Sequence, residues 1–353
     1  MWITSSPSAV KAPTRVALGN FDGVHLGHRE VIRPILSPEA SDSEPDALDY
    51  AVSDLTTLQW IEGYSDTPFS LLQDSAVAPL PGDRPVSTVL TFYPHPQEYF
   101  SGQSRPLLTP IAEKVILLRQ LGVEQLILLP FNQALASLSP EDFINKILLQ
   151  HLQAQHISVG RDFRFGHRRL GTVQDLSAIA SAQGIQVTVA DLKRTGDERI
   201  SSSRIRAALA AGHLTDAEEL LGRPYRLMGR VVEGQKLGRT LGFPTANLEL
   251  PADKFLPCYG VYSVWVYGLN PEPLRPHPGV MNLGYRPTVD GQSPSIEVHL
   301  LGWRGDLYGL TLTVALDRFL RPEQRFDSLE QLKQQIQADA AAATAALSVG
   351  NHP

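Results

Sequence analysis

Apolar and polar positions follow different patterns in the two parts of this chain. Over residues 1–222, short apolar runs alternate with segments whose apolar residues recur every three or four positions, as in amphipathic helices. The predicted strands are residues 14–18, 87–92, 124–131, 156–160 and 185–191, and the predicted helices are residues 28–36, 110–122, 139–153, 172–184 and one that opens at 200–206. Thr109 and Ser139 each precede a proline, as helix-capping residues often do. The alternation predicts an α/β domain with a parallel sheet that binds ligands at the carboxyl ends of its strands.

From residue 223 onwards, strand-like segments follow one another without intervening helices. They are residues 225–234, 260–269, 279–284, 295–302 and 310–320, and helical periodicity returns only at 328–347. This pattern predicts a small antiparallel β-barrel followed by a C-terminal helix. We therefore predict two domains, residues 1–222 and 223–353, with an acidic insertion at about 38–84 in the first.

Composition and charge narrow the classes of protein. The chain is 42% hydrophobic and 19% charged, as ordinary globular proteins are. A net charge of −6 does not favour general binding to nucleic acid or to an anionic membrane. The single cysteine, Cys258, excludes an intrachain disulfide and a cysteine-cluster metal site. The first residues lack a signal-peptide core and no apolar run has membrane-spanning length, so we expect a cytoplasmic protein.

The segment GNFDGVHLGHRE, residues 19–30, lies where the first predicted strand turns into a helix. Gly27 allows close backbone approach, and the imidazoles of His25 and His28 can donate hydrogen bonds to phosphate oxygens. Backbone N–H groups at the start of the helix suit the same ligand. We interpret the segment as a phosphate-binding loop, although H-x-G-H alone fits equally a turn with two exposed histidines.

Two further loops of the first domain contain candidate binding residues. Residues 159–171 interleave aromatic and charged side chains. This pattern is typical of a pocket for a planar heterocycle, but it also fits a basic surface loop with two phenylalanines in the core. Residues 200–206, ISSSRIR, bring hydroxyls and arginines to the start of a helix. These groups can bind a phosphate, or one of the serines can be an ordinary N-cap. The candidates are Asp162, Phe163 and Phe165 in the first loop and Ser202, Ser203 and Arg206 in the second.

In the second domain the segment GQKLGRTLGFPTANL, residues 234–248, is rich in glycine. Such a loop can pack tightly over phosphates with positive charge from Lys236 and Arg239, or form a hairpin with a β-bulge. Thr245 and Asn247 lie two positions apart, on one side of a strand, and can coordinate Mg²⁺ through oxygen atoms.

The strand at 295–302 places Glu297 opposite the face that carries Ile296 and Val298. A carboxylate there can act as a general base toward a hydroxyl, or be a solvated strand residue. Further on, Arg321 and Phe326 can close over an aromatic ligand or cap the domain.

Motifs in both domains resemble one family. GNFDGVHLGH, TFYPHP, GRDFRFG and SSSRIR resemble, in order and spacing, the FMN adenylyltransferase module of bacterial bifunctional riboflavin kinase/FAD synthetases. That module is a nucleotidyltransferase with an H-x-G-H signature. LGRTLGFPTANL, LPCYGVYSV, GVMNLGYRPTV, the Glu297 strand and LRPEQRF resemble riboflavin kinase. Two departures are Ser203, where the family often has threonine, and an insertion longer than the family's usual connection.

The resemblance implies a nucleotidyltransferase-like parallel-sheet domain followed by a kinase barrel, with Mg²⁺ and ATP used in both reactions. Riboflavin would be phosphorylated to FMN in the second domain, and FMN adenylylated to FAD, with release of pyrophosphate, in the first. The implied catalytic residues are Glu297, His28, His25 and Arg206, and the implied metal ligands are Thr245 and Asn247. The implied nucleotide-binding residues are Gly19, Asn20, Phe21, Gly27, Ser202, Ser203, Gly234, Lys236, Gly238, Arg239, Gly242 and Pro244, and the flavin-binding residues are Asp162, Phe163, Phe165, Arg321 and Phe326.

The implied partners are riboflavin, FMN and ATP, with no nucleic acid and no membrane, and a homo-oligomer remains open. Two other functions are compatible with single features of the sequence. Aminoacyl-tRNA synthetases also have an H-x-G-H nucleotide-binding domain, but this chain has no K-M-S-K-S signature and its net charge is −6. A flavin-binding protein without catalysis would have lost Glu297 or the two histidines, and all three are present.

Overall fold

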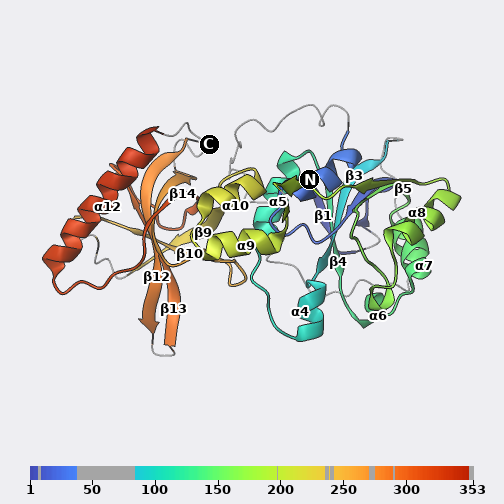
Figure 1. Cartoon of the computed structure of the whole chain (residues 1–353), viewed down its shortest axis with the longest axis horizontal. Helices are drawn as coiled ribbons and strands as arrows, with labels where there is room; N and C mark the ends of the chain where they lie inside the picture. The colour runs from blue at the N-terminus through green and yellow to red at the C-terminus, as the bar shows by residue number, and fades with distance from the viewer. Residues whose placement is uncertain are drawn as a thin grey trace. The chain divides into compact units, whose positions relative to one another are not determined.

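The computed structural model describes residues 1–6, 9–37, 84–196, 198–234, 238, 242–269, 275–288 and 291–349. Within them the chain divides after Ser201 into two compact units (Figure 1). Almost all of the predicted insertion, and two predicted phosphate-binding residues, Lys236 and Arg239, lie outside the described residues.

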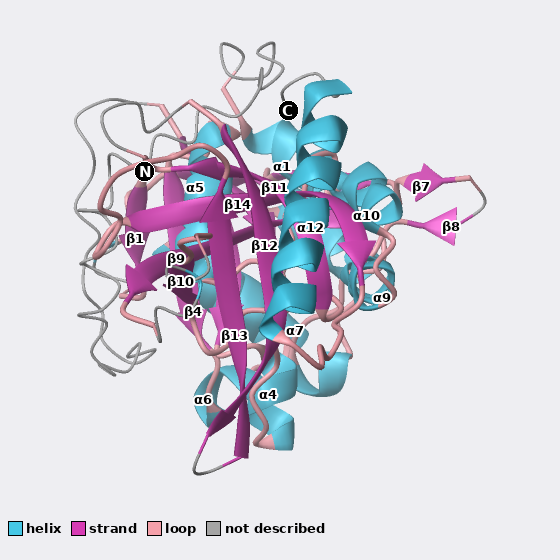
Figure 2. Ribbon diagram, turned by 90° about the vertical axis from the view of Figure 1, so that its left-hand side faces the viewer, coloured by secondary structure: helices cyan, strands magenta, loops and turns pink. Residues whose placement is uncertain are grey.

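The first unit is built on a six-stranded sheet. Its strands are β1 (Trp2–Thr4), β2 (Thr14–Leu18), β3 (Val86–Tyr93), β4 (Gln125–Pro130), β5 (Ala154–Gly160) and β6 (Gln186–Ala190). Their order is β1-β4-β3-β2-β5-β6, and every neighbouring pair is parallel, as predicted. The short ribbon β7 (Arg194–Thr195) and β8 (Glu198–Arg199) is antiparallel and projects from the molecule (Figure 2).

The helices of this unit connect the strands. They are α1 (Leu26–Ile32), η2 (Arg33–Ile35), α4 (Pro96–Ser101), α5 (Ile111–Gln120), α6 (Gln133–Ala136), α7 (Pro140–Asp142), the π-helix η4 (Phe143–His151), η5 (His167–Arg169) and α8 (Val173–Ala182). The hydroxyl of Ser139 caps α7, as predicted, by accepting a hydrogen bond from the Asp142 N–H. The prediction was wrong at Thr109, because the N-cap of α5 is Pro110 and makes no side-chain cap bond.

Apolar side chains from the central strands hold the sheet in place. Val16, Leu18, Leu90, Ile127 and Ile157 are completely or almost completely buried in one core. The helix η4 covers this core with apolar residues at the predicted spacing, namely Phe143, Ile144, Ile147 and Leu148. The carboxyl end of β2 is therefore a fixed starting point for the loop that follows it.

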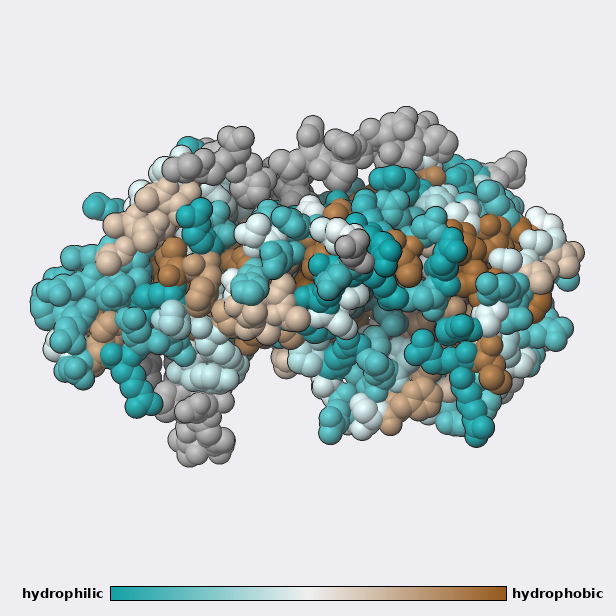
Figure 3. Space-filling view, viewed as in Figure 1, coloured by the Kyte–Doolittle hydropathy of each residue, from teal (hydrophilic) through white to brown (hydrophobic). Residues whose placement is uncertain are grey.

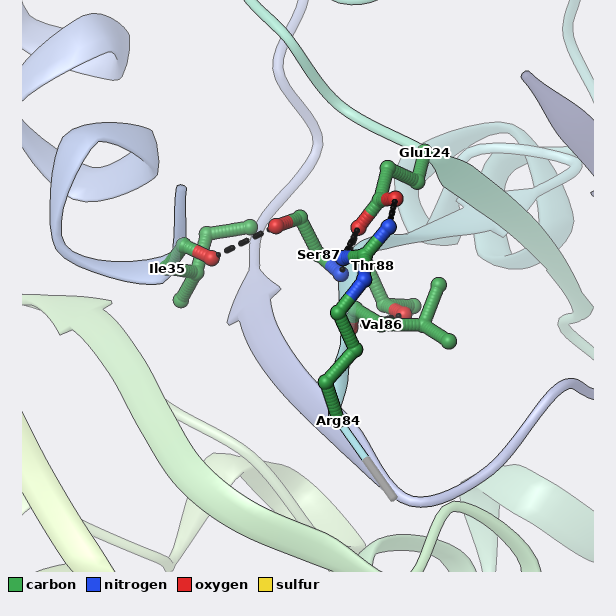
Figure 4. Close-up of polar contacts among 6 residues, drawn as sticks. All are labelled: Ile35, Arg84, Val86, Ser87, Thr88 and Glu124. Atoms are coloured by element: carbon green, nitrogen blue, oxygen red, sulfur yellow. Dashed lines mark hydrogen bonds and ion pairs between the residues drawn. The ribbon is translucent and has the colours of Figure 1, made fainter. Parts of the chain in front are cut away.

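A polar cluster joins the start of β3 to its neighbours (Figure 4). The Arg84 guanidinium donates to both carboxylate oxygens of Glu124, at 3.0 and 2.6 Å. The Ser87 N–H donates to the same carboxylate, and the Ser87 hydroxyl donates to the Ile35 carbonyl at 2.8 Å. Burial raises the pKa of Glu124, but the hydrogen bonds from Arg84 and Ser87 lower it by more. Ser87 thus ties β3 to the end of the helix that follows residues 19–30.

The second unit is a closed antiparallel barrel followed by a C-terminal helix, as predicted, and it also contains two helices before the barrel. It comprises α9 (Ser202–Ala210), α10 (Leu214–Leu221), β9 (Arg226–Val232), β10 (Ala246–Glu249), β11 (Gly260–Tyr267), β12 (His277–Thr288), β13 (Gly291–Leu300), β14 (Thr311–Arg321) and α12 (Leu329–Val349). The barrel order is β10-β13-β12-β11-β14-β9. The helix α12 packs against β11, β12 and β14 (Figure 2).

The helices α9 and α10 belong to the barrel unit by their contacts. The Cys258 N–H donates to the Leu209 carbonyl at the end of α9, and α10 packs on β14. The sequence pattern places the domain boundary after residue 222, and that boundary stays a prediction.

On the face seen in Figure 3, hydrophilic side chains predominate and hydrophobic ones are interspersed among them. Among the described residues, no helix combines the length and the apolar character needed to cross a membrane.

Candidate functional site

The H-x-G-H loop leaves the carboxyl end of β2 and leads into α1. Its first N–H, from Gly19, donates to the Leu90 carbonyl of β3. A Cβ at Gly19 would lie 3.2 Å from the Phe21 ring, so a larger residue there would press on that ring. Phe21 and Val24 both have positive φ, at 48° and 41°, a conformation that bulky residues rarely adopt. The loop is therefore held in a costly shape at the edge where ligands bind to parallel sheets.

The two histidines of this loop stack on each other. Their ring centroids are 3.5 Å apart and their planes differ by 14°. Nδ1 of His25 accepts the His28 N–H at 3.2 Å, so the His25 side chain is itself the cap of α1. One N–H that we expected to bind phosphate is thus used by the cap. With Nδ1 accepting, Nε2 is the other ring nitrogen of His25 and the one that can donate a hydrogen bond.

Gly27 lies beside these rings. A Cβ at this position would lie 3.2 Å from the His25 ring and 3.9 Å from the Ile200 carbonyl oxygen. Any larger residue would push against the first histidine. The small residue between the two histidines therefore preserves their stacking, in addition to the backbone approach that the sequence suggested.

The YPHP loop adds a third histidine at the end of β3. Nδ1 of His95 accepts a hydrogen bond from the backbone N–H of Gln97 and so caps α4. The Glu98 carboxylate in turn accepts a hydrogen bond from the backbone N–H of His95. Burial, with the positive charge of Arg105, lowers the pKa of His95 to about 4. Asp22 of the H-x-G-H loop and Lys114 of α5 are also close enough to influence this ring.

In the barrel, Glu297 lies in a row of polar residues on neighbouring strands. Its register partners are Asn247 on β10 and Asn282 on β12. The hydroxyl of Thr245 donates to Glu297 Oε2 at 3.3 Å, and the hydroxyl of Ser295 donates to Oε1 at 3.3 Å. The neighbouring strand residues Ile296 and Val298 are buried, so Glu297 is on the opposite face, as predicted. Thr245, Asn247 and Glu297 are thus brought together.

Two glycines of the glycine-rich loop closely approach the predicted metal ligands. A side chain on Gly234 would collide with the Asn247 amide. A side chain on Gly238 would collide with the Phe243 carbonyl and lie 3.4 Å from Thr245 Oγ1. Gly242 has φ +89°, which favours glycine. The Pro244 carbonyl accepts a hydrogen bond from His299 at 2.8 Å. The described part of this loop therefore packs against Thr245 and Asn247.

Comparisons with known proteins match both units. The family model for FAD synthetase matches residues 8–48 and 81–204, and the model for riboflavin kinase matches residues 221–347. The chain belongs to the bifunctional riboflavin kinase/FMN adenylyltransferase family. The Pseudomonas fluorescens member is 38% identical over 95% of this chain and 93% of its own. The Escherichia coli K12 member is 38% identical over 92% of this chain and 90% of its own.

A solved structure, described as a macrolide-efflux protein from Streptococcus pneumoniae, also matches nearly the whole chain. It is 26% identical, covers 97% of this chain and 98% of its own, and has a TM-score of 0.73. The family match confirms that this chain has an FAD synthetase domain followed by a riboflavin kinase domain, in the order that the motifs predicted.

The predicted flavin residues of the FAD synthetase domain have different surroundings. Asp162 is exposed and pairs with Arg199 at 2.7 Å. Phe163 is half-buried and stacks on Phe165, with ring centroids 5.7 Å apart. Phe165 is 4% exposed and also contacts Phe143 in the core. Of the two aromatic rings, Phe163 thus has exposed surface that a ligand can contact, whereas Phe165 is buried and packs against Phe163.

The predicted flavin residues of the riboflavin kinase domain lie where β14 leads to α12. The Arg321 guanidinium donates to both oxygens of Asp339, at 2.9 and 2.7 Å. It also lies 5.9 Å from the Phe326 ring centroid. Arg321 therefore joins the end of β14 to α12, and a flavin-binding role for Arg321 and Phe326 stays a prediction.

The serine cluster opens α9, in the barrel unit. Ser202 and Ser203 are the first residues of this helix. Arg206 donates to the Ser202 carbonyl at 3.4 Å and lies 5.7 Å from the Phe255 ring centroid. The binding of an ATP phosphate by these three residues stays a prediction.

Sequence reasoning missed several residues of both sites. Asn282 pairs with Glu297 in register, and an asparagine between the buried Met281 and Leu283 was the available signal. Thr109 and Lys114 contact the H-x-G-H loop from 86 and 94 positions away in the chain, and no local pattern indicates such contacts.

Proposed function

We propose that this chain converts riboflavin to FAD in two ATP-dependent steps, one in each domain. In the kinase step, the riboflavin 5′-hydroxyl oxygen bonds to the γ-phosphorus of ATP, the bond to the β,γ-bridging oxygen breaks, and ADP leaves. Glu297 accepts the hydroxyl proton as general base. In the second step, an FMN phosphate oxygen bonds to the α-phosphorus of another ATP, and pyrophosphate leaves.

The observation that carries the kinase proposal is the grouping of Glu297, Thr245 and Asn247. A carboxylate held by two hydroxyl donors has a defined orientation, which a general base requires. The hydroxyl and amide oxygens beside it are ligands that suit a hard divalent cation such as Mg²⁺ bound to ATP. Among the described residues, no three His, Cys, Asp or Glu side chains form a metal cluster, so the fit rests on these neutral oxygens. A cation there would neutralise phosphate charge.

The adenylyltransferase proposal rests on His25, His28 and Gly27. The stacked imidazoles offer ring N–H donors at one point of the sheet edge, and the glycine admits a ligand close to the backbone. Such donors stabilise the negative charge that develops on the reacting phosphate. This step needs no covalent enzyme intermediate, because positioning and charge neutralisation lower the barrier.

The remaining assignments are proposals of the same kind. Domain boundaries at 1–222 and 223–353, a cytoplasmic location and Mg²⁺ as the divalent metal follow from the sequence patterns and the family. Riboflavin, FMN and ATP are the proposed small-molecule partners. No nucleic acid or membrane partner is proposed, and the oligomeric state stays open.

Two variants test the assignment of one step to each domain. Glu297→Gln keeps the shape of the side chain but cannot accept the proton, so FMN formation should fall by about 10²- to 10⁴-fold. Added FMN should still become FAD in this variant. His28→Ala should slow FAD formation by about 10²- to 10³-fold, so that FMN accumulates from riboflavin. Products are separated by chromatography over time, with wild-type protein as the control.

The results for the two variants test the role of Glu297 and the role of His28 separately. A Glu297→Gln protein that phosphorylates riboflavin at nearly the normal rate would remove Glu297 from the mechanism. Normal FAD output from His28→Ala would refute the phosphate role of His28. Wild-type protein that yields neither product would contradict both proposed activities.

A further inference from the structure

The H-x-G-H loop is held from outside by a segment far along the chain. The hydroxyl of Thr109 accepts the Gly23 N–H at 2.9 Å, and the Thr109 N–H donates to Asp22 Oδ1 at 3.2 Å. Thr109 is 2% exposed and Asp22 is 5% exposed. Two buried hydrogen bonds therefore join Thr109 to the loop, and Thr109 is the acceptor in one and the donor in the other. The tip of the loop cannot move without breaking them.

The helix α5, which follows Thr109, supplies a buried cation to the same loop. Lys114 is 6% exposed, and its Nζ donates to the Asn20 carbonyl oxygen at 2.9 Å. The Thr91 hydroxyl donates to that same oxygen at 3.1 Å. Burying an ammonium group is costly unless good acceptors surround it, so such a residue is rarely kept for packing alone. Lys114 therefore fixes the carbonyl that begins the loop.

These contacts lie on either side of the unusual backbone. Phe21 has φ 48° and Val24 has φ 41°, and a β-branched residue at positive φ is rare. Such conformations persist only when the surrounding structure imposes them. The bonds to Asn20, Asp22 and Gly23 act on the residues beside Phe21 and Val24. His25 follows Val24 directly, so the direction of the first histidine depends on how this stretch is held.

The side-chain oxygen of Asn20 is also enclosed. Among the described residues it has no hydrogen-bond partner. The backbone carbonyl of the same residue, by contrast, is held by Lys114 and Thr91.

We infer that Thr109 and Lys114 are positioning residues for adenylyl transfer: they hold residues 20–24 so that His25 and His28 face the phosphates of ATP. The inference rests on the proposed phosphate role of these histidines. Neither residue needs to touch the reacting atoms. Lys114 also brings a positive charge to the start of the loop, where the substrates are anionic.

The test removes each contact with little change of shape. Lys114→Met keeps the length of the side chain and removes the ammonium group, and Thr109→Val keeps the branching and removes the hydroxyl. We expect kcat for FAD formation from FMN and ATP to fall by about 100-fold, the loss typical of small misplacements, with KM for FMN nearly unchanged. Thr109→Ser, which retains the hydroxyl, should recover most of the rate. Lys146→Met, at an exposed ion pair in the same unit, should behave as wild type.

Riboflavin phosphorylation by the same variants is measured in parallel, together with thermal unfolding. A kcat within threefold of wild type in both Lys114→Met and Thr109→Val would overturn the inference. So would a loss that follows only the unfolding temperature and disappears on cooling. If Lys114→Met does not fold, the Thr109→Val and Thr109→Ser pair decides. A normal rate in His28→Ala would instead refute the proposed histidine role.

Discussion

His25, His28 and His95 lie at the same edge of the first sheet in three different environments. His25 is buried and caps α1, His28 stacks on it, and His95 caps α4. Side chains that serve as caps have one ring nitrogen fixed as an acceptor. The protonation of His95 is also restricted, since burial and the charge of Arg105 lower its pKa to about 4. A neutral His95 at physiological pH preserves the cap that begins α4.

This low pKa predicts a pH dependence of stability. An unfolded histidine has a pKa near 6.5, so between pH 6.5 and about 4 the unfolded chain binds a proton that native His95 does not. The contribution of His95 is therefore complete above pH 6.5 and is lost as the pH falls toward 4. By NMR, the His95 ring should not titrate between about pH 5.5 and 8. His95→Gln should flatten the slope of unfolding free energy against pH in the acidic range. A ring that titrates near the ordinary value would contradict this prediction.

Most elements of both units could be predicted from the sequence, because their hydrophobic periods are long and clear. The strands β2 to β6 and the long barrel strands lie where the pattern predicted them. Elements of three to six residues, such as β1, α4 and α6, are too short to establish a period, and they were missed. Thr109 shows a second limit. A threonine before a proline looks like a helix cap, but its hydroxyl accepts a tertiary bond from Gly23 instead.

The candidate sites show the same division. His25, His28, Thr245, Asn247 and Glu297 could be proposed because they stand in local motifs. Residues that lie beside these motifs on another strand could not be proposed, because no short segment of sequence determines the register between two strands. The pairing of Glu297 with Asn282 is of this kind.

At the scale of elements, a buried charged pair adds to the apolar packing of α12 against the barrel. Arg321 ends β14, and Asp339 lies in the middle of α12, with side chains 16% and 8% exposed. The Gln335 amide donates to the same carboxylate at 2.9 Å. A pair this well buried and doubly hydrogen bonded sets the register of the helix against the barrel.

Removing one member of the pair should therefore be costly. Asp339→Ala leaves the Arg321 guanidinium in a largely buried place without its carboxylate, and we expect the free energy of unfolding of the barrel unit to fall by about 3 kcal/mol. Asp327→Ala, at an exposed carboxylate just before α12, is the matched control and should change stability by less than about 0.5 kcal/mol. The unfolding free energies of both variants are measured by denaturant titration, with the loss of riboflavin kinase activity as the probe of the barrel unit. Equal effects of the two substitutions would contradict a fastening role for Arg321 and Asp339.

At the scale of the whole molecule, the chain joins two units that have separate cores and separate candidate sites. The H-x-G-H loop lies entirely in the first unit, and Glu297 with its neighbours lies entirely in the second. The product proposed for the barrel is the substrate proposed for the sheet domain. Among the residues that the structure describes, the H-x-G-H loop and the Glu297 group have no member in common.

This independence predicts that two chains, each defective in one of the two steps, complement each other. Glu297→Gln supplied with riboflavin should make neither FMN nor FAD, and His28→Ala should stop at FMN. An equimolar mixture should form FAD from riboflavin and ATP, because FMN released by one variant reaches the intact sheet domain of the other. The rate should rise with total protein concentration, and FMN should appear before FAD in the chromatograms. A chain that carries both substitutions is the control and should form neither product. A mixture that accumulates FMN without FAD would mean that FMN passes only within a single chain, and the two sites would then have to be treated as one device.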